Sequence, residues 1–335
     1  MACIGYEMKE FYLKIKNSSA WSNLGPIGIF AAIFILLSLF TPSFRSAANF
    51  TQILLSAAVY MMLAMGMTFV IIAGGIDLSV GSIVGLSGGV VFILLTTFKM
   101  NLWLALLIGV LCSALCGLLN GAAVTKLGLI PFIATLGGQW VYRGILKLLN
   151  NGGTISIRNI APEEAVSKVS FLGSGRLLGI PVPVYVVAFF AVLLTFLLKR
   201  TTYGRSVYAI GSNKEAAAMS GINVKLVTLK TFILAGIMAG IAGILLASRM
   251  VSVQSSAGTG YEFEGIFSAV VGGVSMAGGE GSVLGAIVGA LIVATLRNGL
   301  NLNGINSFWQ QVILGILIIV VVYVDSLKTK KRASV

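Results

Sequence analysis

Residues 54–98 read LLSAAVYMMLAMGMTFVIIAGGIDLSVGSIVGLSGGVVFILLTTF, and Asp77 is the only charged residue among them. A continuous helix over this stretch would be about 67 Å long, roughly twice the thickness of the hydrocarbon core of a membrane. The stretch therefore predicts two membrane-spanning helices, with a break at Gly74-Gly75-Ile76-Asp77.

The rest of the chain has the same character, because 57% of its 335 residues are apolar, only 10% are charged, and the mean hydropathy is +1.00. A soluble domain carries about 25% charged residues, so the composition excludes an ordinary cytosolic enzyme. We predict an all-α polytopic membrane protein with about ten transmembrane helices. Outside 54–98, the predicted spans are 24–40, 102–124, 131–149, 181–198, 231–248, 265–277, 283–296 and 308–324.

The basic residues predict the orientation of these spans. Residues 1–23 form a basic N-terminal tail, residues 24–324 a single transmembrane domain with a cytoplasmic loop at 199–230, and residues 325–335 a basic C-terminal tail. With ten crossings and both termini in the cytoplasm of a bacterium, 14 of the 23 Lys and Arg residues lie inside. The net charge of +13 is thus interpreted as a topology signal of an inner-membrane protein, and no nucleic-acid partner is expected.

A short internal repeat lies at the ends of two pairs of spans. Residues 73–85 and 277–289 share seven of thirteen positions at a constant offset of 204, including Ala-Gly-Gly and Gly-x-Ile-Val-Gly. Both copies fall at cytoplasmic turns of the predicted topology. Related halves are common in transporters, and the repeat favours a transport function.

The chemistry available to the chain is restricted, because it has no histidine and only three cysteines. No cluster suits a metal ion, and the commonest general base is missing. The sequence also lacks the G-x-x-x-x-G-K-[ST] pattern that binds nucleotide phosphates. We therefore expect a non-catalytic chain with no cofactor of its own, driven by another subunit or by an ion gradient.

Polar residues inside spans are the candidates for a transport pathway. Asp77 is expected at the cytoplasmic end of the third span, either as a helix cap or in gating. Arg143 either extends to the membrane interface or lines a polar route with Gln139 and Tyr142. Asn120 can face the same route. None of these residues identifies a cargo.

The cytoplasmic loop contains Asn213-Lys214-Glu215-Ala216-Ala217-Ala218-Met219-Ser220-Gly221. Alanine and glutamate favour a helix, and Gly221 is placed to end it. The simplest interpretation is a surface helix that joins two spans. The Glu-Ala-Ala triplet followed by glycine also resembles the loop through which permeases of ATP-binding cassette (ABC) importers dock their ATPase subunits.

Further segments strengthen this resemblance and extend it over residues 45–325. They are Gly74-Gly75-Ile76-Asp77-Leu78-Ser79-Val80-Gly81-Ser82, Pro131-Phe132-Ile133-Ala134-Thr135-Leu136 with Arg143-Gly144, Thr202-Tyr203-Gly204-Arg205, Ser220-Gly221-Ile222-Asn223, Gly258-Thr259-Gly260-Tyr261-Glu262, Val271-Gly272-Gly273 and Asn298-Gly299-Leu300-Asn301. Together they resemble the permeases of ribose-type monosaccharide ABC importers.

The resemblance implies an ABC importer permease fold and several partners. It implies a cytoplasmic ATPase that binds ATP and magnesium, a periplasmic or lipid-anchored sugar-binding protein, and a second permease copy or a homologous permease. Residues Glu215, Ala216, Ala217 and Gly221 would then couple the ATPase to transport. The implied cargo is a ribose-like monosaccharide.

The alternatives within this class are another pentose, a hexose or a signalling furanose of the autoinducer-2 type. A different class, an ion-coupled or facilitative carrier, would need no ATPase. An intramembrane enzyme is disfavoured by the lack of histidine or of a nucleophile pair.

Overall fold

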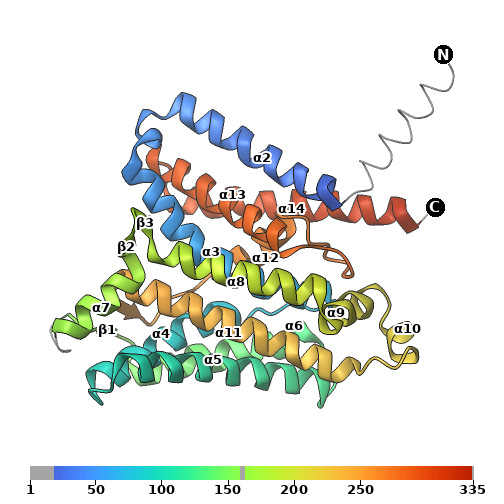
Figure 1. Ribbon diagram of the computed structural model, residues 1–335, viewed down its shortest axis with the longest axis horizontal. Helices are drawn as coiled ribbons and strands as arrows, with labels where there is room; N and C mark the ends of the chain where they lie inside the picture. The colour runs from blue at the N-terminus through green and yellow to red at the C-terminus, as the bar shows by residue number, and fades with distance from the viewer. Residues whose placement is uncertain (1–18, 159–162, 334–335) are drawn as a thin grey trace.

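The computed structural model describes residues 19–158 and 163–333, which form a bundle of helices with two small two-stranded sheets at one end, β1 with β4 and β2 with β3 (Figure 1). The N-terminal tail up to residue 18 lies outside the described residues. The elements in chain order are α2 (Ser19–Phe40), η1 (Pro42–Arg45), α3 (Ala47–Ile72), α4 (Val80–Thr96), α5 (Leu102–Thr125), α6 (Pro131–Leu149), β1 (Thr154–Ser156), α7 (Glu163–Ser174), β2 (Arg176–Leu177), β3 (Ile180–Pro181), α8 (Val182–Arg200), α9 (Thr202–Ser212), α10 (Lys214–Met219), α11 (Val224–Met250), β4 (Ser252–Gln254), α12 (Tyr261–Val271), α13 (Val283–Leu302) and α14 (Ser307–Ala333).

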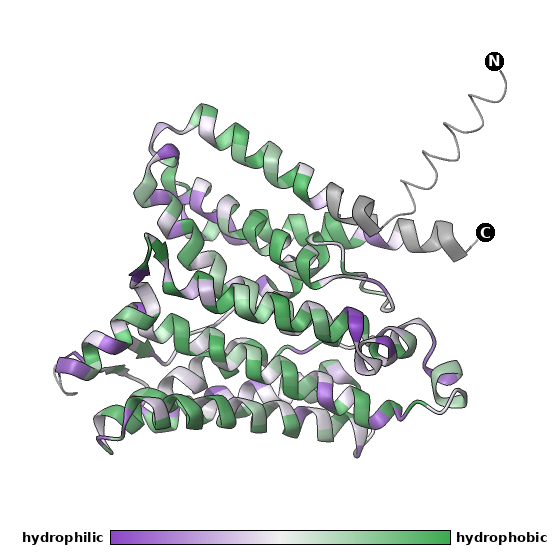
Figure 2. Ribbon diagram, in the orientation of Figure 1, coloured by the Kyte–Doolittle hydropathy of each residue, from purple (hydrophilic) through white to green (hydrophobic). Residues whose placement is uncertain are grey.

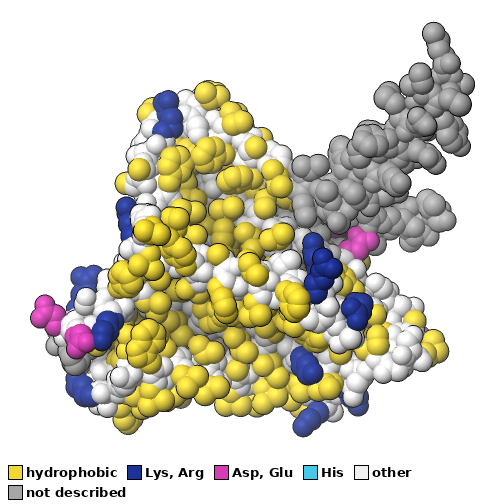
Figure 3. Space-filling model, viewed as in Figure 1, with side chains coloured by type: hydrophobic (Ala, Val, Ile, Leu, Met, Phe, Trp, Pro, Cys, Tyr) yellow, Lys and Arg dark blue, Asp and Glu magenta, His cyan; other side chains and the backbone are white. Residues whose placement is uncertain are grey.

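Most of these helices suit a membrane. Five are long and apolar enough to cross one, namely α3, α5, α8, α11 and α13, and shorter apolar helices cover Gly25–Phe40, Val80–Thr96 and Ser307–Tyr323. Figure 2 shows the apolar residues spread along these helices, and Figure 3 shows an apolar band between two ends where Lys and Arg gather. The all-α membrane fold is therefore confirmed.

Two of the less apolar predicted spans, 131–149 and 265–277, differ in how well the structure matches them. The fifth matches α6, which runs from Pro131 to Leu149. The eighth, predicted at 265–277, is wrong as a full helical crossing, because α12 has only 11 residues and ends at Val271. A helix of that length covers about 16 Å, or half of the hydrocarbon core. Residues 255–260, between β4 and α12, form turns.

The predicted break in residues 54–98 is confirmed. Helix α3 ends at Ile72 and α4 starts at Val80. Gly74 has a φ of +83°, which a residue with a Cβ rarely adopts, so the chain turns sharply there. At the other terminus, α14 continues to Ala333, so the C-terminal tail predicted from residue 325 prolongs the last helix.

Small residues bring the central helices together. Helix α3 is buried along nearly its whole span, and α11 packs against α3, α4 and α5. A Cβ added at Gly236 would lie 2.5 Å from the carbonyl oxygen of Ser113, and one added at Gly243 would collide with the carbonyl oxygen of Val84. Because helices in lipid gain little from burying apolar surface, such close approach is what stabilises their packing.

Hydrogen bonds assign the helix termini to two ends of the bundle. At one end, Asn303 donates to the Thr41 hydroxyl over 2.9 Å, which joins the ends of α13 and α2. At the other end, the amide of Gly279 donates to the carbonyl of Ile72 over 2.9 Å, so the second copy of the internal repeat contacts the residue just before the first copy. Figure 1 shows the described start of α2, the described end of α14, α9 and α10 at this second end, as an even number of crossings requires.

Candidate functional site

The connection between α3 and α4 places Asp77 in the interior of the bundle. Asp77 is fully buried, and its Oδ1 accepts hydrogen bonds from the amide of Ser79 over 2.8 Å and from the Ser79 hydroxyl over 2.6 Å. The side chain thus fixes the turn that starts α4, which resembles the capping alternative. The sequence predicted its place at the cytoplasmic end of the third span but not its full burial.

Three of the predicted pathway residues belong to one hydrogen-bonded chain. The Asn120 amide donates to the Ser79 hydroxyl over 2.7 Å, and the Tyr142 hydroxyl donates to Asn120 Oδ1 over 2.9 Å. Asp77 joins this chain through Ser79. The chain ties the start of α4 to α5 and α6, so polar groups inside the bundle satisfy each other.

Arg143 binds the backbone of residues 255–260, the connection that precedes α12. Its guanidinium donates to the carbonyls of Ser255, over 3.1 Å, and of Ala257, and more weakly to that of Gly81, over 3.4 Å. The side chain therefore ends on backbone carbonyls inside the protein, and it does not extend to the membrane interface. It holds the connection before α12 beside the start of α4.

The starts of α4 and α12 meet where two glycines touch. A Cβ at Gly258 would collide with the carbonyl oxygen of Gly81, so neither helix start could approach the other with larger residues. Glu262, in the first turn of α12, is 3% exposed and accepts a hydrogen bond from Gln139 over 3.0 Å. We call the contact of Gly81, Gly258 and Glu262 the helix-start junction. Two helix N-termini facing a carboxylate favour its negative charge.

Glu262 was not among the predicted site residues, and neither was the buried ion pair between Glu264 and Arg297. The Glu264 side chain is only 5% exposed, and the Arg297 side chain is 31% exposed. The sequence signal that could have identified this site was the pair of carboxylates, Glu262 and Glu264, at the start of a short apolar helix. Such a pattern marks a functional site in a membrane segment.

Helix α10 has the local structure that the sequence predicts. The Asn213 side chain accepts a hydrogen bond from the Ala216 amide over 2.9 Å, and Gly221, at a φ of +81°, follows the end of the helix. Glu215 and Ala216 are exposed.

Ala217 differs from its predicted role. It is 4% exposed and packs inward against its own chain, so its side chain is not available to a partner. Met219, which the sequence analysis did not select, is 83% exposed on the same short helix. Six residues are too few for periodicity to indicate which face is buried.

Helix α9 links α10 to the end of α3 and to the connection between α12 and α13. Gly211 lies so close to Ile72 and Gly279 that a Cβ would collide with their backbone atoms. Tyr208 donates from its hydroxyl to the carbonyl of Gly281 over 2.7 Å. Burial raises the pKa of Tyr208, so the hydroxyl stays protonated and remains a donor. A displacement of α10 would therefore reach the connection between α3 and α4 and the connection between α12 and α13.

The described residues contain no group of three or more His, Cys, Asp or Glu residues placed to hold a metal ion. The geometry suits mechanical coupling. The exposed helix α10 is joined through α9 to connections that lead to the helix-start junction inside the bundle.

Comparisons with known proteins agree with this geometry. Residues 49–322 match a family described as the permease component of a branched-chain amino acid transport system. The chain is 39% identical over 317 residues to the ribose import permease protein of Bacillus subtilis, covering 94% of this chain and 96% of the relative. It is 36% identical to the ribose import permease protein of Escherichia coli K12, with coverages of 88% and 91%. It is 33% identical to the xylose transport system permease protein of the same strain, with coverages of 97% and 98%. No solved structure matches the chain significantly.

Proposed function

Because the chain belongs to the family of branched-chain amino acid transport system permease components, we propose that it forms the membrane pathway of an ABC importer for a neutral monosaccharide, with ribose as the first cargo to test. The relatives named for ribose are 36–39% identical, and those named for D-allose and xylose 37% and 33%. Identities this similar favour a sugar over an amino acid and leave the particular sugar to experiment.

The observation that carries the ATP-driven mechanism is the exposed face of α10. Glu215, Ala216 and Met219 are exposed on a helix capped at both ends. An exposed methionine beside a carboxylate suits a cleft of a partner protein that is apolar with a basic rim. We infer that this partner is a separate ATPase, because the chain carries no P-loop of its own.

The end of the bundle with α9 and α10 is the one we assign to the cytoplasm. Lys199, Arg200, Arg205, Lys214, Lys225 and Lys230 lie between the end of α8 and the first turns of α11. Both chain termini are then cytoplasmic. The opposite end, with α7 and the two small sheets, faces outward, where a sugar-binding protein would dock.

Labelling of single cysteines tests this orientation. Lys214→Cys, on α10, should react with a membrane-impermeant maleimide only after the cells are permeabilised. Ser167→Cys, on the exposed face of α7, should react in intact cells. Labelling of position 214 from outside would reverse the assignment.

An ion-coupled or facilitative carrier is the rival function, and the purified chain alone separates the two. In liposomes without any ATPase, we expect no ribose uptake above that of protein-free liposomes, with or without a gradient of protons or sodium. Uptake by the chain alone would establish the carrier and refute the importer.

A further inference from the structure

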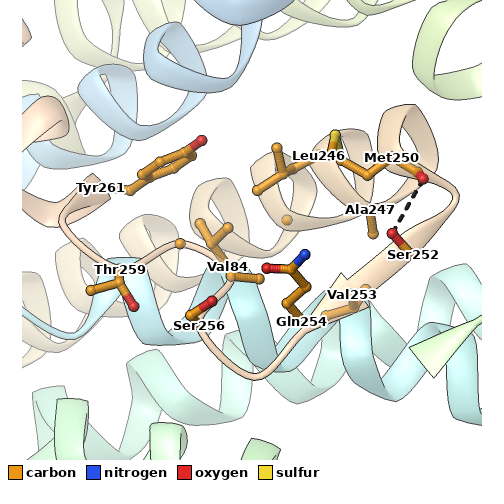
Figure 4. Close-up of a pocket in the computed structure, with 13 residues that line it drawn as sticks. Val84, Leu246, Ala247, Met250, Ser252, Val253, Gln254, Ser256, Thr259 and Tyr261 are labelled. Carbon is orange, nitrogen blue, oxygen red and sulfur yellow. Dashed lines mark hydrogen bonds between the residues drawn. The ribbon is translucent and has the colours of Figure 1, made fainter. Parts of the chain in front are cut away.

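A cavity of about 260 Å³ lies at the proposed outer end of the bundle. It is enclosed by the last turns of α11, by β4, by the connection before α12 and by Val84 of α4 (Figure 4). Pockets for drug-sized ligands have volumes of about 300–1,000 Å³, so this cavity suits a smaller solute.

The lining of the cavity is uncharged. One wall is apolar and contains Leu246, Ala247 and Met250, and the other carries the side chains of Gln254, Ser256 and Thr259. Figure 4 shows the Gln254 amide between these walls, and the one hydrogen bond drawn there joins Ser252 to the Met250 carbonyl. The Gln254, Ser256 and Thr259 side chains are exposed, so their polar atoms are accessible to a solute.

The cavity adjoins the helix-start junction. Gly258 belongs to both, and Val84 lies within 3.0 Å of the position of a Cβ at Gly258. Arg143, which does not line the cavity, donates a hydrogen bond to the carbonyl of Ala257, which does. Tyr261, the first residue of α12, completes the lining with its ring. A solute in the cavity would therefore contact the segment that moves if the junction opens.

We propose that this cavity is a monosaccharide-binding site within the permease, and this inference rests on the proposed function. A sugar presents hydroxyl groups around its edge and C–H groups on its faces. Gln254, Ser256 and Thr259 supply donors and acceptors for the hydroxyls, while Leu246, Met250 and the Tyr261 ring contact the apolar face. The site takes the sugar after the binding protein releases it and before the junction opens.

The same lining excludes an amino acid as the preferred cargo. A zwitterion carries a carboxylate and an ammonium group, and burying either without a charged partner costs several kcal/mol or more. The cavity lining contains no Asp, Glu, Lys or Arg side chain. A neutral polyol needs only the hydrogen bonds that the amide and the hydroxyls provide.

Protection of a cysteine in the cavity tests the site directly. Thr259→Cys, in a full-length chain whose three native cysteines are replaced by alanine, is reacted with a charged methanethiosulfonate in proteoliposomes. Ser167→Cys, exposed on α7, is the matched control. We expect millimolar ribose to slow modification at position 259 at least threefold, to leave position 167 unchanged, and leucine to protect neither.

If ribose leaves the rate at 259 unchanged, or leucine slows it equally, the cavity is not a sugar site. Ser256→Cys repeats the test if Thr259→Cys does not insert. Gln254→Ala should in addition raise the KM for uptake by the complete transporter several-fold with kcat within twofold, and an unchanged KM would overturn the assignment. ATP-driven ribose uptake by the unaltered complex, measured alongside, separates the two claims: its absence refutes the proposed function, and its presence without protection refutes only the cavity site.

Discussion

The amide of Gly279 donates a hydrogen bond to the carbonyl of Ile72 over 2.9 Å, although the two residues are 207 positions apart in the chain. Ile72 ends α3 just before the connection to α4, and Gly279 lies between α12 and α13. The connection between α3 and α4 and the connection between α12 and α13 therefore meet at one point. Gly211 of α9 packs against that point and is three residues before the start of α10.

Tyr208→Phe should weaken coupling between the ATPase and transport. The change removes the hydrogen bond to Gly281 with little change in volume. A hydrogen bond of this kind contributes about 1 kcal/mol, so we expect roughly a fivefold fall in sugar transported per ATP hydrolysed. ATPase association and ATP hydrolysis should persist.

Ser206→Ala is the control for this variant, because Ser206 is half-buried on α9 and its hydroxyl bonds only within its own helix. If Tyr208→Phe and Ser206→Ala transported the same amount of sugar per ATP hydrolysed, the proposed connection through α9 would be contradicted.

Met219→Asp should detach the ATPase. Burying a methionine side chain at an interface contributes about 1.5–3 kcal/mol, so the apparent Kd of the ATPase should rise more than tenfold. Leu178→Asp, which alters a side chain that is 98% exposed in the turn between β2 and β3, is the matched control. Binding is measured by co-purification at graded ATPase concentrations. Equal binding by both variants would exclude α10 as the docking helix.

Arg143→Leu should abolish uptake while the ATPase still binds. The carbonyls of Ser255 and Ala257 lose their donor in an apolar interior, which costs about 1–3 kcal/mol for each unsatisfied group. The connection before α12 then loses its fixed position. Lys147→Leu, one turn further along the same helix and exposed, should transport normally. Similar uptake rates for the two variants would count against a role for Arg143 at the junction.

Gly236→Ala should destabilise the bundle, because its methyl group would meet the Ser113 carbonyl of α5. Overpacking of this kind costs about 1–3 kcal/mol. Gly144→Ala has open space around it and should leave the melting temperature in detergent unchanged or higher. If Gly236→Ala melted no lower than Gly144→Ala, close helix packing would not explain this glycine.

The features that hydropathy and local chemistry control could be predicted from the sequence. The break after Ile72, the bounds of α6 and the ends of α10 follow from glycines, prolines and an Asn cap close to them in the chain. The sequence also placed Asn120 and Tyr142 on one polar route, but the link of both residues to Asp77 through Ser79 was not predicted.

Other features depend on contacts that are distant in sequence. Glu262 meets Gln139 across 123 positions, and no local pattern pairs them. The half-length of α12 follows from the glycine contact between Gly258 and Gly81 on another helix. The inward position of Ala217 depends on how α10 lies against the rest of the chain.

The central claim is tested most directly by ribose uptake into proteoliposomes that contain this chain with its co-purified ATPase, with the sugar-binding protein on the outer face of the permease. We predict uptake when ATP is present on the α10 side, none with ADP, and no change when ionophores collapse the proton and sodium gradients. Uptake that continues without ATP, or that stops when those gradients are collapsed while ATP remains, would contradict the account.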